Sequence, residues 1–174
     1  MAIKGAVLGD ILGSQYEFNR PKNLDWQNIP LIIDDKAKFT DDSVMMLAIK
    51  KALVEDNDLV ETMVDVGQQY PFCGYGAKFF SWINGKKHQP YNSWGNGSAM
   101  RVAFVGDFYE DYDEMQAMAA KTAEVSHNHP EGIKGAVVTA TCIWMAKRGK
   151  SKQEIYDYVL SEYPVDLYDY SIGN

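Results

Sequence analysis

Apolar residues recur along this chain mainly at the three- and four-residue spacing of an amphipathic helix. Val44, Leu47 and Ala48 follow that spacing and predict a helix over residues 41–53, with Thr40 as its N-terminal cap. No sustained stretch of the sequence alternates strictly between apolar and polar residues, as a half-buried β-strand would. The pattern therefore predicts an all-α protein.

Residues that favour helix starts and stops delimit the other expected helices. Asp58 and Ser151 are each followed three positions later by Glu, which is the spacing of a capping box. Pro130 suits a first helical turn, because the N–H that proline lacks would have no partner there. The expected helices are residues 2–12 before Gly13, two helices that begin at Asp58 and Ser151, residues 113–125, and residues 130–148 before Gly149.

Three loops separate these helices, at residues 13–39, 71–76 and 86–97. They are rich in Gly, Asn, Tyr and Trp, and such loops usually carry the binding groups of a helical domain. No internal repeat or linker interrupts the 174 residues, so we expect one domain over residues 1–174. A domain of this length buries roughly 70% of its unfolded surface and needs no structural metal. We therefore expect any bound metal to be catalytic.

The net charge of −7 and the absence of a Lys/Arg run exclude duplex nucleic acid as an expected partner, because phosphate neutralisation requires a basic face. A small phosphorylated ligand stays compatible, since backbone N–H groups or divalent cations can meet phosphates locally. Cys73 and Cys142 lack the spacing of a zinc or redox site. The chain start lacks a signal-peptide layout and no apolar run could span a membrane, so we expect a cytoplasmic protein.

Acidic and hydroxyl side chains cluster at the start of the helix over residues 41–53. The oxygens of Thr40, Asp41 and Asp42 could hold a hard cation such as Mg²⁺, although capping of the helix explains the same residue types. Asp10 lies in an apolar segment, where a carboxylate needs a partner, and it either reaches the same polar cavity or is partly exposed. Glu17, expected on the following loop, is a candidate general acid and base or a solvated residue.

The segment over residues 91–101 is the most distinctive of the chain. Its glycines permit close backbone approach, and a following helix would direct N–H groups at a phosphate. A glycine-rich turn that only joins two helices is the alternative. The candidate ligand-binding residues of this loop are Ser93, Trp94, Gly95, Asn96, Gly97 and Ser98.

Two further segments contribute candidate binding residues. His127 and His129 form an H-x-H pair, but no third ligand stands at a useful spacing, so we expect a hydrogen-bonding role for His127 rather than a transition-metal site. The loop containing Gly74, Tyr75 and Gly76 could stack on a base or ribose, whereas packing and turn formation are the common role of such residues.

Taken in order, these motifs resemble the ADP-ribosylglycohydrolase family. The resemblance covers nearly the whole chain and the N-terminal part, about two-thirds, of a family domain. The motifs that carry it are G-x-x-x-G-D at 5–10, Y-E at 16–17, T-D-D-S at 40–43, G-Y-G at 74–76, W-G-N-G-S-A-M-R at 94–101 and S-H-N-H-P at 126–130.

The resemblance implies an orthogonal helical bundle around two Mg²⁺ ions, with Mn²⁺ as the alternative metal. The substrate would be an ADP-ribose-containing small molecule or an ADP-ribosylated protein, and the bond between the terminal ribose and its acceptor would be hydrolysed. Thr40, Asp41 and Asp42 match the first metal motif, and Glu17 matches the loop glutamate near the scissile bond. Asp10 would join Glu17 in catalysis, either by binding a metal-bound water or by orienting the neighbouring metal ligands. The residues at 93–98 would bind the diphosphate and ribose, with Gly74, Tyr75, Gly76 and His127 beside them.

One family feature has no match in this chain. The second acidic motif, D-x-D followed by Ser or Thr, is not found, since the Asp pairs at 56–58 and 111–113 lack the neighbouring glycines and hydroxyl. Half of the metal ligands would then be missing, and each hard cation needs about six oxygens. We therefore expect a domain truncated at its C-terminus, either a natural short member that uses other ligands or waters or a fragment of a longer chain, with a catalytically weak or inactive ADP-ribose-binding module as the alternative function. Uncovered apolar surface would favour a homodimer.

Overall fold

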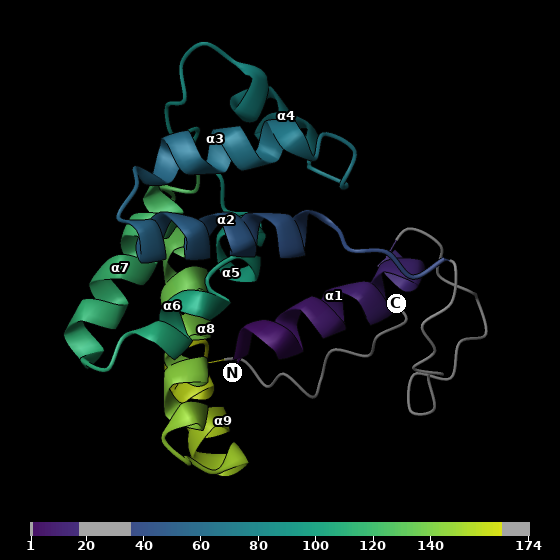
Figure 1. The fold of residues 1–174 in the computed structure, drawn as a ribbon. Helices are drawn as coiled ribbons and strands as arrows, with labels where there is room; N and C mark the ends of the chain where they lie inside the picture. Colours follow the sequence, from purple (N-terminus) through teal and green to yellow (C-terminus); the bar gives the residue numbers. More distant parts are fainter. Residues whose placement is uncertain (1, 18–35, 165–174) are drawn as a thin grey trace.

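The computed structural model describes residues 2–17 and 36–164, and within them it confirms the all-α prediction, with helices and no strand. In Figure 1, α2 and α3 lie side by side, α1 runs obliquely near the start of α2, and α8 runs down the molecule to α9. The helices are α1 Ala2–Glu17, α2 Asp41–Glu55, α3 Leu59–Gln69, α4 Ala77–Asn84, α5 Gly97–Met100, α6 Ala103–Phe108, α7 Tyr112–Glu124, α8 Pro130–Lys147 and α9 Lys152–Glu162.

The helix starts lie where the capping residues predict them. The Thr40 side chain accepts a hydrogen bond from the N–H of Asp42, and Asp58 accepts one from Glu61. At Ser151 both halves of the capping box are present. Pro130 occupies the first turn of α8. Local side-chain chemistry therefore sets four of the helix boundaries.

The predicted end of the first helix at Gly13 is wrong. The helix α1 continues to Glu17, so Glu17 is the last helical residue rather than part of a loop. A glycine stops a helix when it adopts a left-handed conformation, as Gly149 does with a φ of 76°. Gly13 stays helical, and the Ser14 hydroxyl donates to the carbonyl of Ile11 within the same turn. Of the expected loop over 13–39, residues 18–35 lie outside the described residues.

The core joins α2 to the helices around it. Met45, Ile49, Met63, Ile83 and Met115 are fully or almost fully buried. Burying side chains of this size contributes about 1.5–3 kcal/mol each, which makes this cluster the main source of stability. The core thus holds the start of α2 and the loops before α4 and α5 in fixed positions relative to one another.

The helices α1 and α9 contribute no buried residue, although both carry apolar side chains. Leu8 of α1 is 48% exposed. This exposure is the feature on which the homodimer expectation rests, and the dimer stays a prediction. No described helix is long and apolar enough to cross a membrane.

Gly106 sets how closely α6 approaches α8. A Cβ at this position would collide with the carbonyl oxygen of Ala140 and lie 2.9 Å from the Cβ of Ile143. We predict that Gly106→Ala lowers the free energy of unfolding by about 1–3 kcal/mol, because backbone must move to admit the methyl group. Urea denaturation measures the change.

Gly135→Ala on α8 is the matched control. Its Cβ would lie 3.9 Å from the Cβ of Ala99, an ordinary contact. The substitution should stabilise the protein by about 0.5–1 kcal/mol, because alanine favours the helix over glycine. Equal effects of the two substitutions would contradict the close approach at Gly106.

Candidate functional site

Asp10 ties the first helix to the start of the second. Its carboxylate accepts hydrogen bonds from the N–H and hydroxyl of Thr40, at 2.8 and 2.6 Å, and from the N–H and hydroxyl of Ser43, at 3.2 and 2.5 Å. The partner that a carboxylate in this apolar segment requires is therefore the opening turn of α2. Hydrogen bonds to a charged group are the stronger class, so this junction fixes how α1 meets α2.

Asp41 and Asp42 extend the acidic group around this turn. The pKa of Asp41 is raised to about 6 by burial and then by the neighbouring charge of Asp42. Burial, followed by the charges of Asp10 and Glu17, raises the pKa of Asp42 to about 6 as well. The charges of Asp10 and Glu17 thus oppose the ionisation of Asp41 and Asp42, which is the electrostatic setting that a bound cation would relieve.

The loop before α4 is held against Asp41. The N–H of Asp41 donates to the carbonyl of Cys73 at 2.7 Å. Gly74 follows with a φ of 94°, a left-handed conformation that a side chain would strain, and its Cβ position lies 3.5 Å from a carboxylate oxygen of Asp41. Tyr75 is partly buried against the core, and Gly76 lines the cavity that opens beside Asp41.

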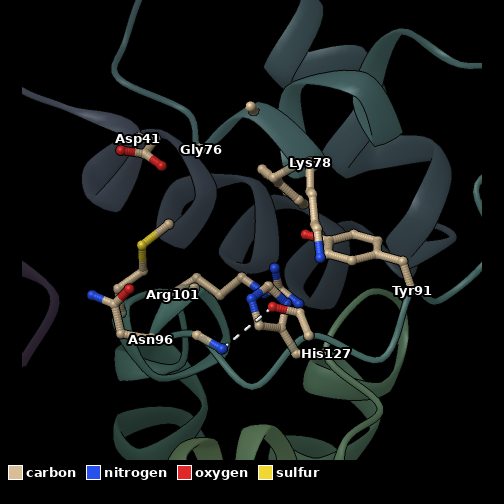
Figure 2. Close-up of a pocket in the computed structure, with 13 residues that line it drawn as sticks. Asp41, Gly76, Lys78, Tyr91, Asn96, Arg101 and His127 are labelled. Atoms are coloured by element: carbon tan, nitrogen blue, oxygen red, sulfur yellow. Dashed lines mark hydrogen bonds between the residues drawn. The ribbon is translucent and has the colours of Figure 1, made fainter.

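A cavity of about 340 Å³ opens beside this group, within the size range of small-molecule sites. Figure 2 shows Asp41 on one side of it and Asn96, Arg101 and His127 on another. Four segments distant in sequence therefore meet here: the start of α2, the first turn of α4, the glycine-rich loop and the segment before α8 that carries His127. The predicted residues that line the cavity are Asp41, Gly76, Ser93, Gly95, Asn96, Gly97 and His127.

The glycine-rich loop lies directly against His127. A Cβ at Gly97 would be 2.8 Å from Nε2 of His127, so only glycine allows this approach. The N–H of Gly95 donates to the hydroxyl of Ser93 at 3.3 Å, which folds the loop back on itself. The helix that follows, α5, has a single turn, so its dipole adds less to anion binding than a long helix would.

Two predicted residues of this loop do not line the cavity. Ser98 is 1% exposed, and its hydroxyl donates to the carbonyl of Gly132 in α8. Trp94 is 74% exposed and does not line the cavity. Ser98 therefore anchors the loop to α8, while the binding role predicted for Trp94 is not tested by these contacts.

Arg101 was missed by the sequence analysis as a site residue, and it is fully buried at the base of the cavity. Its Nη2 donates to the carbonyl of Thr122 at 2.7 Å and to the hydroxyl of Ser126 at 2.9 Å. Its Nε and Nη1 have no hydrogen-bond partner among the described residues. Burial lowers the pKa of Arg101 to about 10, so the guanidinium keeps its charge at neutral pH. A lone basic residue within the apolar run 99–105 is the signal that could have identified it.

His127 is 4% exposed and neutral at neutral pH. Its pKa is lowered to about 4 by burial and then by the charge of Arg101. Its Nδ1 lies 2.8 Å from the hydroxyl of Ser126, and the ring of Tyr91 packs beside it with a centroid distance of 5.9 Å. The predicted role of His127 as a hydrogen-bonding group thus agrees with its surroundings. Lys78 and Tyr91 extend towards the same part of the cavity from the other side (Figure 2), and neither was singled out from the sequence.

The model of the ADP-ribosylglycohydrolase family matches residues 1–171. The chain belongs to this family. Among curated proteins it is 28% identical to ADP-ribosylhydrolase ARH3 of Homo sapiens and of Mus musculus, with 87% of this chain and 50% of each relative covered. The protein of the same name from Gallus gallus is 25% identical over 88% of this chain and 51% of the relative. The chain thus spans about half the length of these relatives.

The metal ligands of this family member stay a prediction. Oxygen donors suited to a hard cation are present at Asp41 and Asp42. Within residues 2–17 and 36–164, however, no three His, Cys, Asp or Glu side chains form a group that could hold a metal ion. Thr40 already serves as the cap of α2 and as a donor to Asp10. The described residues therefore provide donors of the right kind without a complete ligand set.

The junction between α1 and α2 provides a test of this arrangement. We predict that Asp10→Asn lowers the free energy of unfolding by about 2 kcal/mol or more, because an amide presents a donor where the carboxylate accepts from Thr40 and Ser43. Thermal or urea denaturation measures the loss. Amide hydrogen exchange should also accelerate at Thr40 and Ser43.

Asp65→Asn is the control for the loss of one negative charge. Asp65 forms only an exposed ion pair with Lys51, at 3.6 Å, and its replacement should change stability by less than about 0.5 kcal/mol. A stable Asp10→Asn protein with unchanged exchange at Thr40 and Ser43 would contradict the proposed junction.

Proposed function

We propose that this chain binds the ADP-ribose moiety in the 340 Å³ cavity and takes part in metal-dependent hydrolysis of the bond between its terminal ribose and an acceptor. The observation that carries the proposal is the division of charge along one cavity, with Asp41 beside the acidic group and Arg101 at the base. The relatives named ADP-ribosylhydrolase support the same reaction class. The acceptor would be a protein side chain or a small molecule, and the expected compartment is the cytoplasm.

The charge division suggests how the ligand would lie. Phosphate oxygens would face the glycine-rich loop and Arg101, where backbone N–H groups and a buried positive charge are available. The terminal ribose would then extend towards Asp41. This direction places the scissile bond near the end of α1, where the charge of Glu17 acts on Asp41 and Asp42.

In hydrolysis, water adds to the anomeric carbon of the ribose while the bond to the acceptor oxygen or nitrogen breaks. The departing atom must gain one proton and the water must lose one. Glu17 is the proposed residue for both transfers, because it is exposed at the end of α1 and belongs to the acidic group. The loop and Arg101 would hold the diphosphate, and Asp10 would keep the opening turn of α2 in place.

Asp41 and Asp42 are the proposed holders of Mg²⁺, or of Mn²⁺. A divalent ion bound there would supply positive charge that orients ribose hydroxyls and water. The raised pKa values of the two carboxylates support this assignment, since nearby negative charge and burial disfavour their ionised forms without a cation. Two ions, as in the family, are part of the same proposal.

A binding module without turnover is the second candidate function. It is favoured by the incomplete ligand set of the described residues and by the half-length match to the relatives. The residues expected to bind phosphate, by contrast, lie within this chain. Binding of ADP-ribose is therefore common to both candidates, and turnover separates them.

A turnover assay distinguishes hydrolase from binding module. We predict release of ADP-ribose from ADP-ribosylated Ser or Arg peptides, or from O-acetyl-ADP-ribose, when Mg²⁺ or Mn²⁺ is present and not when it is chelated. Asp41→Asn and Asp42→Asn should each reduce the rate at least about 100-fold, because the charge that would hold the ion is removed. Liquid chromatography of the released ADP-ribose measures the rate.

Asp113→Asn is the control for these substitutions, because Asp113 is an exposed aspartate in the first turn of α7, at the position that Asp42 occupies in α2. Its turnover should equal that of the unaltered protein. Calorimetric binding of ADP-ribose without turnover under any metal condition would leave the binding module as the function.

The approach of Gly97 to His127 gives a test of ligand binding. We predict that Gly97→Ala raises the Kd for ADP-ribose about tenfold or more, because the new methyl group displaces the imidazole from the cavity wall. Isothermal titration calorimetry measures the Kd. Gly95→Ala, whose Cβ would lie 4.0 Å from the same Nε2, should change it less than about threefold. Equal losses for the two variants would show that contact with His127 is not the cause.

A further inference from the structure

A chain of hydrogen bonds leads from Arg101 to His127 beneath the cavity. A guanidinium can only donate, so the hydroxyl oxygen of Ser126 must accept from Nη2 of Arg101 at 2.9 Å. The hydroxyl hydrogen of Ser126 then needs an acceptor. Among the described residues, the other partner of this hydroxyl is Nδ1 of His127, at 2.8 Å. Nδ1 of His127 is therefore the atom that accepts a hydrogen bond from the Ser126 hydroxyl.

A neutral imidazole that accepts at Nδ1 carries its hydrogen at Nε2. The Nε2 atom faces the glycine-rich loop, 2.8 Å from the Cβ position of Gly97 and 4.0 Å from that of Gly95, and His127 lines the cavity. A second proton on the ring is opposed by burial and by the positive charge of Arg101. The His127 ring therefore carries a single N–H, at Nε2, on the side of the glycine-rich loop.

We propose that Arg101 and Ser126 are positioning residues that hold His127 in its Nε2–H tautomer, so that His127 donates a hydrogen bond to an acceptor oxygen of the ligand. Nε and Nη1 of Arg101 are likewise buried without a partner among the described residues. The donor at Nε2 of His127 would recognise a group that accepts a hydrogen bond, such as a phosphoryl oxygen. The identity of the ligand rests on the proposed function, whereas the tautomer does not.

The other two histidines provide internal references. Nδ1 of His88 lies 2.7 Å from the carbonyl of Trp82, and a carbonyl can only accept, so neutral His88 carries its hydrogen at Nδ1. His129 is half-buried, and its Nδ1 accepts from the N–H of Glu131 at 3.1 Å. His88 and His127 should therefore show opposite tautomers in one protein.

Long-range ¹H–¹⁵N correlation spectra of the ¹⁵N-histidine-labelled protein at pH 7 test the proposal, with His88→Gln and His129→Gln for assignment. We expect His127 to show a protonated Nε2 and an unprotonated Nδ1, and His88 to show the reverse. A protonated Nδ1 on His127, or a doubly protonated ring, would overturn the proposal. This measurement needs no variant at the positions in question.

Ser126→Ala removes the donor to Nδ1 and tests the consequence. We expect the His127 signals to shift towards a mixture of tautomers and the Kd for ADP-ribose to rise about tenfold, roughly the value of one buried hydrogen bond. Ser161→Ala, which removes a hydroxyl bonded to the carbonyl of Tyr158 in α9, is the control and should change neither. Unchanged His127 signals and Kd in Ser126→Ala would overturn the positioning role.

The two proposals fail in different ways. If the unaltered protein shows the expected tautomers but calorimetry detects no ADP-ribose binding, the proposed function is wrong and the hydrogen-bond chain to His127 stands. If ADP-ribose binds while His127 carries its hydrogen at Nδ1, the proposed function stands and the positioning role of Arg101 and Ser126 is wrong.

Discussion

The contact between Asp10 and the opening turn of α2 is the interaction on which the candidate site depends. Two N–H groups and two hydroxyls converge on one carboxylate, and they belong to residues that are 30 and 33 positions away. Helix N-termini need acceptors for their free N–H groups, and here Asp10 and Thr40 provide them. Asp41 and Asp42 are consequently not required as caps. Capping of α2 accounts for Thr40 but not for the carboxylates of Asp41 and Asp42, so another role is open to them.

The opposite end of the cavity depends on a buried charge. Removing a guanidinium from water costs several kcal/mol even after the surrounding protein relaxes. Two hydrogen bonds from Nη2 and the face of Phe79, 5.7 Å from the guanidinium carbon, offset part of that cost for Arg101. Nε and Nη1 add to the cost while they lack a partner. The charge of an anionic ligand in the cavity would offset part of this cost, so the buried guanidinium fits the proposed binding role better than a stabilising one.

Sequence reasoning predicted the features that depend on local chemistry. The caps at Thr40, Asp58 and Ser151 follow from side chains that bond to backbone two or three positions away, and such rules hold whatever surrounds the helix. Gly13 shows the limit of these local rules. A glycine permits a helix stop without requiring it, and α1 continues because its last turns meet the start of α2.

The parts of the site that sequence reasoning missed depend on contacts between distant segments. The sequence around Arg101 does not indicate that Ser126 accepts a hydrogen bond from it. The sequence around Gly97 likewise does not indicate that an imidazole occupies the space that a side chain would need. The motif identified the glycine, but only packing shows the reason for it. Ser98 illustrates the converse, since a residue within the motif bonds to α8 and supports the loop instead of facing the cavity.

The two ends of the cavity also differ in how complete their sets of ligand-binding groups are within the described residues. The donors at the base come from Arg101, His127 and the glycine-rich loop, which hold one another through the bonds of Ser126 and Ser98. The acidic end provides carboxylates but no complete set of metal ligands within residues 2–17 and 36–164. Under the proposed function, recognition of an anionic ligand would depend on contacts that the described residues already form, whereas cleavage would require further ligands for the ion. Because the two requirements fall on different residues, binding and turnover would then be separable properties of this fold.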